Sequence, residues 1–200
     1  MKYLTKGKPS RLILAFALPI FLANLLQLTY SLVDTRIVGS FLGEDALAAV
    51  GATSSLSNLI IGFLMGLSNG FAIVTAQRFG AKDLRGVKKS FAMSLTLGIA
   101  VAAGLTVLGL LFLQPILRFL NVPENLRTMA GSYIVIIIAG LIATFLYDAC
   151  AAALRALGDT ITPLVILAIS VILNIAGDLF FVVVLKTKLM THTVPRMVPS

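Results

Sequence analysis

The sequence is poor in charged residues and nearly devoid of cysteine and histidine. Of its 200 residues only 12% are charged, with one cysteine, Cys150, and one histidine, His192. Soluble domains carry roughly 25% charged residues, so this composition argues against a soluble fold. A single cysteine excludes an internal disulfide and does not identify the redox compartment.

Motifs of soluble enzymes are also missing. The sequence contains no phosphate-binding glycine loop, no Cys/His metal spacing and no nucleophile elbow. Two aspartates, Asp148 and Asp178, faintly resemble the pair of intramembrane aspartyl proteases. However, Ile175 replaces the first glycine of that family's Gly-x-Gly-Asp motif, and the two aspartates belong at different depths. We therefore expect neither an enzyme nor a cofactor.

Long apolar runs dominate the sequence, which is 58% hydrophobic. Runs of about 20 residues or more are long enough to cross ~30 Å of hydrocarbon as helices. The sequence predicts an all-α integral membrane protein with five spans, at 12–38, 48–77, 89–113, 129–154 and 162–185. The N-terminus resembles a signal peptide, but its apolar run is too long and has no cleavage site, so we expect a retained first span.

The basic residues indicate an orientation rather than a nucleic-acid partner. They lie between the apolar runs, without interleaved aromatic residues, although the net charge is +8. With the N-terminus inside, ten Lys and Arg residues fall on the cytoplasmic side and six outside. The positive-inside rule then favours a multi-pass protein of the cytoplasmic membrane with its N-terminus inside.

Three aspartates, at positions 34, 148 and 178, stand inside the apolar runs, and Asn174 precedes the last of them by four residues. A carboxylate at such depth costs about 2.5–3.5 kcal/mol on insertion scales, so intramembrane acids are functional candidates. Asn174 and Asp178 lie one helical turn apart on the last span. At ~1.5 Å per residue, Asp34 and Asp178 fall at similar depth in the outer half of the membrane. Asp148, near the cytoplasmic end of its span, is excluded from this pair.

Three further features of the first two spans have more than one explanation. Asn24, Gln27 and Tyr30 form a polar stripe that either bonds a neighbouring helix or lines an aqueous cavity, and we favour the cavity because the stripe leads toward Asp34. Pro19 is expected to bend the first span, as a fixed kink or as a hinge. On the second span, glycines recur at every fourth residue (62, 66 and 70), which favours close helix packing over the lining of a path.

Several segments together resemble the N-terminal half of a multidrug and toxic compound extrusion (MATE) transporter. The resemblance covers roughly residues 8–185, in the expected order and spacing. It is carried by Phe16-Ala17-Leu18-Pro19-Ile20, Leu32-Val33-Asp34-Thr35, Ala76-Gln77-Arg78-Phe79-Gly80, Leu154-Arg155-Ala156-Leu157-Gly158-Asp159, and Asn174 with Asp178.

The resemblance implies a MOP-superfamily fold, in which two six-helix bundles enclose a cavity that opens alternately to either side. Family roles then assign the cation site, for H⁺ or for Na⁺ as a metal ion, to Asp34, Asn174 and Asp178. Gln27 matches a polar position of the same cavity, which Asn24 and Tyr30 of the polar stripe are expected to line with it, and Pro19 matches the bend of the first helix. The expected activity is cation-coupled antiport of small organic, cationic compounds across the lipid bilayer.

The end of the sequence departs from that family. Residues 186–200 are polar and interrupted by proline where a sixth span is expected, and a second bundle is missing. A truncated or frameshifted reading frame, or a fragment, would explain this, and we expect the piece alone to be inactive. Two other functions stay open: a lipid-linked precursor flippase, which needs a strongly cationic cavity, and a non-transporting membrane scaffold.

Overall fold

A computed structural model describes residues 9–42 and 44–180, without the side chains of residues 9, 34, 37–47, 178 and 179. This part of the chain is helical, which confirms the expected all-α fold. Six helices follow one another: α1 (Pro9–Leu42), α2 (Glu44–Gly80), α3 (Leu84–Leu111), α4 (Leu113–Phe119), α5 (Glu124–Ala156) and α6 (Ile161–Leu179). The tail at 186–200, with His192, lies outside the described residues, as does the end of the expected last span.

Four helices are long and apolar enough to cross a membrane, and α6 is a shorter apolar helix over Ile161–Gly177. The expected number of five helices is wrong by one, because the separate seven-residue helix α4 follows α3. Pro115 explains the break. Its ring would collide with the carbonyl of Leu111, so α3 ends there, whereas proline is tolerated in the first turn of α4.

Glycine and capping contacts close the turn between α5 and α6. Gly158 adopts a positive φ of 85° just after α5, and its N–H donates to the carbonyl of Arg155 at 3.0 Å. The N–H of Asp159 donates to the carbonyl of Leu154 at 2.9 Å. Together these bonds form a Schellman motif, in which glycine accepts the left-handed backbone without strain. The motif ends α5 and redirects the chain into α6.

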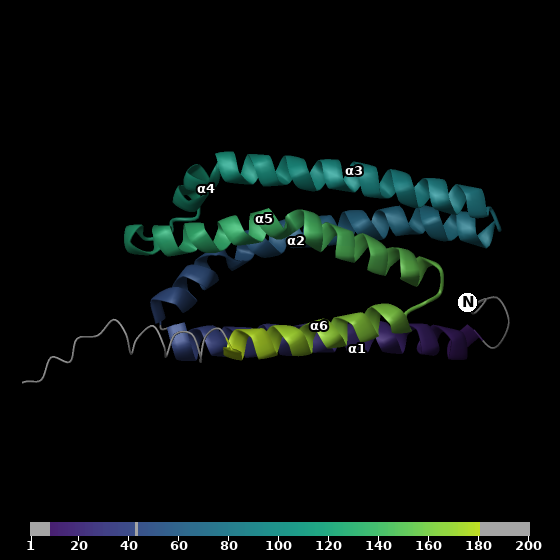
Figure 1. Ribbon diagram of the computed structural model, residues 1–200, viewed down its shortest axis with the longest axis horizontal. Helices are drawn as coiled ribbons and strands as arrows, with labels where there is room; N and C mark the ends of the chain where they lie inside the picture. Colours follow the sequence, from purple (N-terminus) through teal and green to yellow (C-terminus); the bar gives the residue numbers. More distant parts are fainter. Residues whose placement is uncertain (1–8, 43, 181–200) are drawn as a thin grey trace, which may run out of the picture.

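The helices form two groups (Figure 1). In the first group, α2, α3 and α5 pack against one another. The short helix α4 lies at the end of this group where α3 ends and α5 begins. Its core is a cluster of buried side chains from all three long helices: Leu64, Ala102, Ile134, Ile138, Leu141, Phe145 and Ala149. In a membrane such a core is held together by close van der Waals packing rather than by the removal of apolar surface from water.

The second group is the pair α1 and α6, which lie side by side along their lengths (Figure 1). This pair meets the first group mainly where α1 joins α2 and where α5 joins α6. No residue of α1 with a described side chain is buried, and in α6 only Pro163 is. The faces of α1 and α6 are therefore open to lipid, solvent or further protein.

The glycines of α2 do not do what their spacing predicts. A Cβ placed on Gly62, Gly66 or Gly70 meets nothing within 4 Å, so within the described chain no neighbour packs on this face. Close approach occurs instead on α3, where a Cβ on Gly98 would overlap the Phe145 ring. Periodicity places the three glycines on one face of α2, but within the described chain no helix packs against that face.

Candidate cation site on the paired helices α1 and α6

The polar stripe of α1 is present on the outside of the described structure. Asn24 and Gln27 are exposed, and Tyr30 is half-buried. At 100° per residue, Asn24, Gln27 and Asp34 fall within one sector of the helix surface. Ser31 falls in the same sector and is also exposed, although the sequence analysis did not single it out.

On α6, Asn174 is exposed and its side chain folds back along its own helix. Its Nδ2 donates a hydrogen bond to the backbone carbonyl of Ser170 at 3.0 Å. This bond positions the amide so that its Oδ1, the atom that can bind a cation, has no protein donor among the described residues. Ser170, Asn174 and Asp178 recur at every fourth residue and share one face. Ser170 was not among the predicted site residues, although its position four residues before Asn174 places it on the same helix face.

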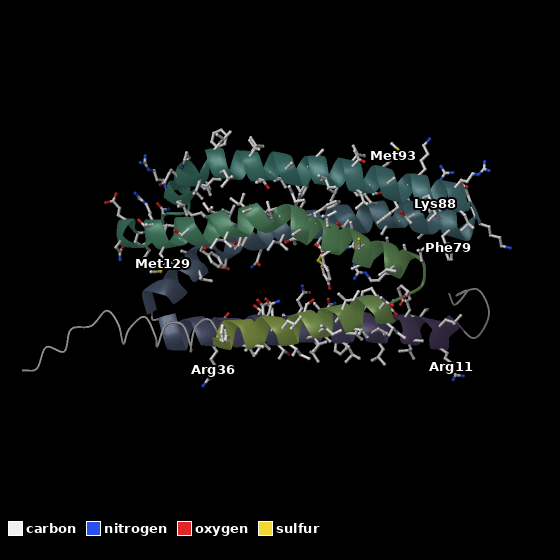
Figure 2. The ribbon with its side chains drawn as sticks, in the orientation of Figure 1. Arg11, Arg36, Phe79, Lys88, Met93 and Met129 are labelled. Atoms are coloured by element: carbon white, nitrogen blue, oxygen red, sulfur yellow. The ribbon has the colours of Figure 1, made fainter. Side chains whose placement is uncertain are left out.

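The two helices run in the same direction, and their C-terminal ends lie at the same end of the pair (Figure 1). Asp34 is eight residues before the end of α1, and Asp178 is one residue before the end of α6. In Figure 2, Arg36, two residues after Asp34, projects from the side of the pair that is turned away from α2, α3 and α5. The side chains of Asp34 and Asp178 themselves lie outside the described part of the chain. Their backbones thus come to one end of the pair, from segments far apart in sequence.

Asp148 belongs to the opposite end. It lies eight residues before the end of α5, and α5 ends where α6 begins. Because Asp178 is at the far end of α6, the length of that helix separates the two residues. The half-buried Asp148 is therefore not placed to join the proposed site.

No group of three His, Cys, Asp or Glu residues placed to hold a metal ion occurs among the described residues. The two carboxylates predicted to bind Na⁺ are not part of that set, since their side chains are not described. Pro19 lies within α1, which continues through it as one helix from Pro9 to Leu42. The bend at Pro19 stays a prediction.

Residues 19–180 match the protein family MatE. The chain belongs to this family. Two relatives from Bacillus subtilis are the probable multidrug resistance proteins YoeA, 36% identical over 173 residues, and YpnP, 31% identical over 170 residues. A third is the FAD transporter of Shewanella oneidensis, 27% identical over 168 residues.

The matched segments cover 84–86% of this chain but only 37–38% of each of these three relatives. A solved MOP superfamily transporter from Pyrococcus furiosus superposes with a TM-score of 0.84 at 26% identity, over 91% of this chain and 40% of that one. MATE structures described as bent and straight superpose with TM-scores of 0.83 and 0.80, each at 26% identity and with the same coverage.

These matches confirm the MATE resemblance. This MatE chain is a multi-pass membrane protein, and it spans about two fifths of the length of its relatives. The names of the relatives describe transport and drug resistance rather than catalysis.

Proposed function

We propose that this chain forms the N-terminal bundle of a cation-coupled efflux transporter for small organic, cationic compounds. The observation that supports this most is the parallel pairing of α1 with α6. It brings the backbone segments of Asp34, on α1, and Asp178, on α6, to one end of the pair. Asn174 lies on α6, one turn before Asp178.

The proposed coupling follows from the cost of charge in a nonpolar environment. Two carboxylates near each other in a bundle repel and are poorly solvated, so a proton or Na⁺ that neutralises them is bound favourably. Carboxylate and amide oxygens suit a hard cation such as Na⁺. An occupied site favours a packed bundle, and an empty site favours a hydrated one. Two states biased by occupancy are what alternating access requires.

The driving force is sufficient for export. Moving one charge across 100 mV supplies about 2.3 kcal/mol, and a proton gradient of one pH unit adds about 1.4 kcal/mol. The proposal places the protein in the cytoplasmic membrane with its N-terminus inside, because basic residues are concentrated on that side. The substrate cavity, with Asn24, Gln27 and Tyr30 on its wall, would be completed by a C-terminal bundle.

The rival flippase function needs basic side chains facing a cavity, and α1 and α6 offer little of that kind. Within their described parts the basic residues are Arg11 and Arg36 on α1, with none on α6. Both arginines point away from the other helices in Figure 2. A diphosphate headgroup would therefore find no basic residue on the inner side of this pair. The same argument applies to other polyanionic cargo.

Transport into everted membrane vesicles tests the proposal. The vesicles should carry the gene together with its downstream coding sequence, and a pH-sensitive dye should report ion exchange with and without sodium. Asp34→Asn and Asp178→Asn are expected to reduce ion-driven uptake of a cationic dye to background. Asp148→Asn, the same chemical change at the opposite end, is the matched control and should retain uptake. Full ion-driven uptake by Asp34→Asn would refute the assignment.

A scaffold role is separated from transport by Asp178→Leu. A protein whose polar residues only hold helices together should lose assembly, as seen by size-exclusion chromatography in detergent. A transporter should assemble normally and lose ion coupling. The 200-residue chain alone is expected to show no uptake in the same assay, because the second half of the cavity is supplied by residues it does not contain.

A further inference from the structure

A groove lies at the hairpin between α2 and α3, and no residue of α1 or α6 lines it. It has a volume of about 530 Å³ and lies between the last turns of α2 and the first turns of α3. Lys88, Met93 and Phe79, labelled in Figure 2, mark this end of the bundle. None of the residues proposed for the cation site lines it.

The groove is graded from charged to apolar along its length. Its basic residues, Arg78, Arg85 and Lys89, stand at the end of the bundle, within two turns of the hairpin. Met93 and Leu97 follow Lys89 on α3, one and two turns deeper, and so extend the groove by about 12 Å. Both are more than half exposed, at 55% and 52%, so the apolar floor is open to the surroundings.

The hairpin that forms the groove is held by specific bonds. The Asp83 carboxylate accepts a hydrogen bond from the Gly86 N–H at 2.8 Å and lies 3.5 Å from Nη1 of Arg78. A Cβ on Gly86 would collide with this carboxylate and crowd Arg78, so the missing side chain lets the ion pair lie against α3. The groove is therefore part of a folded corner rather than a chance gap between side chains.

Charge in the groove is not balanced by the protein. Three basic residues and one acid line it, and the acid, Asp83, is already engaged by Arg78. Among the described residues, Arg85 and Lys89 form no ion pair. The ion pair of Arg78 is solvent-exposed and thus weak, so its guanidinium is also available to an added anion. The unmatched positive charge favours binding of an anion in the groove.

We propose that this groove binds one anionic phospholipid from the leaflet that meets the α2–α3 hairpin. Its phosphate would lie among Arg78, Arg85 and Lys89, and the start of an acyl chain would follow Met93 and Leu97. Basic pockets between membrane helices are known to hold acidic headgroups, and the apolar continuation favours a lipid over a soluble anion. The proposal does not depend on the cation site, because it uses other residues at another part of the bundle.

Lipid binding to the 200-residue chain in detergent, followed by native mass spectrometry, tests this inference. The probes are phosphatidylglycerol and phosphatidylcholine with identical acyl chains. We expect tighter binding of phosphatidylglycerol, and a loss of about tenfold or more in its affinity in the double variant Arg85→Gln/Lys89→Gln. Both side chains are exposed, so the variant should fold, which circular dichroism verifies.

The neighbouring substitution Lys88→Gln is the matched control. Lys88 is next to Lys89 and carries the same charge but does not line the groove, so its loss should change the affinity by less than about twofold. The single variant Lys89→Gln is compared with this control. Equal losses of phosphatidylglycerol affinity in Lys88→Gln and Lys89→Gln would show diffuse surface attraction and overturn the site. So would equal binding of the two lipids, or competition by inorganic phosphate or deacylated glycerophosphoglycerol at the concentration of the lipid.

Discussion

Phe145 of α5 rests its ring against the backbone of Gly98 of α3, at a point where no larger residue fits. A Cβ on Gly98 would overlap the ring, and the Phe145 side chain is fully buried and cannot swing away cheaply. This contact joins two helices of the core cluster that also holds Leu64 of α2. At this point the approach of α3 to α5 thus depends on the absence of a side chain at Gly98.

Replacing Gly98 by alanine is therefore expected to destabilise the bundle. Overpacking a filled core costs roughly 1–3 kcal/mol, which exceeds the gain of up to about 1 kcal/mol in helix propensity. The measurement is thermal unfolding in detergent micelles, followed by circular dichroism. Gly104→Ala is the control on the same helix, since a Cβ there meets nothing within 4 Å, and it should be neutral or stabilising. Equal stability of the two variants would contradict this packing.

A hydrogen bond also links α3 to α5. The hydroxyl of Thr106 lies 3.1 Å from the Ile138 carbonyl and 2.9 Å from the Ala102 carbonyl of its own helix. Hydrogen bonds between membrane helices average about 0.6 kcal/mol, so Thr106→Val should lower the unfolding free energy by no more than about 1.7 kcal/mol. Thr96→Val is the control, because Thr96 bonds only Ala92 of its own helix. The same unfolding assay would show no difference between them if the α3–α5 bond were unimportant.

The first turn of α6 depends on Asp159, which lies in the turn outside the membrane-spanning helices. Its Oδ2 accepts a bond from the Thr162 hydroxyl at 2.6 Å, and its Oδ1 accepts from the N–H groups of Thr162 and Ile161 at 3.0 and 3.2 Å. The bonds from Thr162, followed by that from Ile161, lower the pKa of the Asp159 carboxyl below its usual value. Asp159→Ala should cost about 0.5–2 kcal/mol at neutral pH, as the loss of a helix cap does.

The pH dependence of this cap has a definite sign. Because the folded-state pKa is lowered, the stabilisation is present above the usual aspartate pKa and disappears as the pH falls through the folded value. The stability difference between the native chain and Asp159→Ala should therefore shrink as the pH falls below the usual aspartate pKa of about 4. Thermal unfolding at several pH values measures it, and a difference that stays constant would contradict the ionised cap.

Pro19 offers a test of motion in α1. Without an N–H, it leaves the carbonyl of Ala15 without its helical partner, which weakens the helix locally. If α1 changes its curvature during transport, Pro19→Ala should slow uptake in the vesicle assay while leaving expression unchanged. Leu18→Ala, on the exposed surface of the same turn, is the control. Uptake at the native rate in Pro19→Ala would show that the proline is only a static kink.

Fold class followed from composition because the length of an apolar helix is set by the thickness of a membrane. The short helix α4 was not anticipated, since seven residues interrupted near Pro115 carry too weak a periodic signal. Helical spacing alone predicted that the polar stripe of α1 leads toward Asp34. It also predicted that Asn174 and Asp178 lie one helical turn apart on the same face. The cation-binding role of Asp34, Asn174 and Asp178 stays a prediction, and so does the cavity-lining role of the stripe.

Contacts between helices could not be found in this way. Spacing marked Gly62, Gly66 and Gly70 as one face, yet the close contact is at Gly98, because only the position of α5 decides which glycine meets a large ring. Likewise, the amino acids show that α1 and α6 each carry polar residues, but not that they lie parallel and side by side. Local patterns depend on the geometry of one helix, whereas pairing depends on how several surfaces fit together at once.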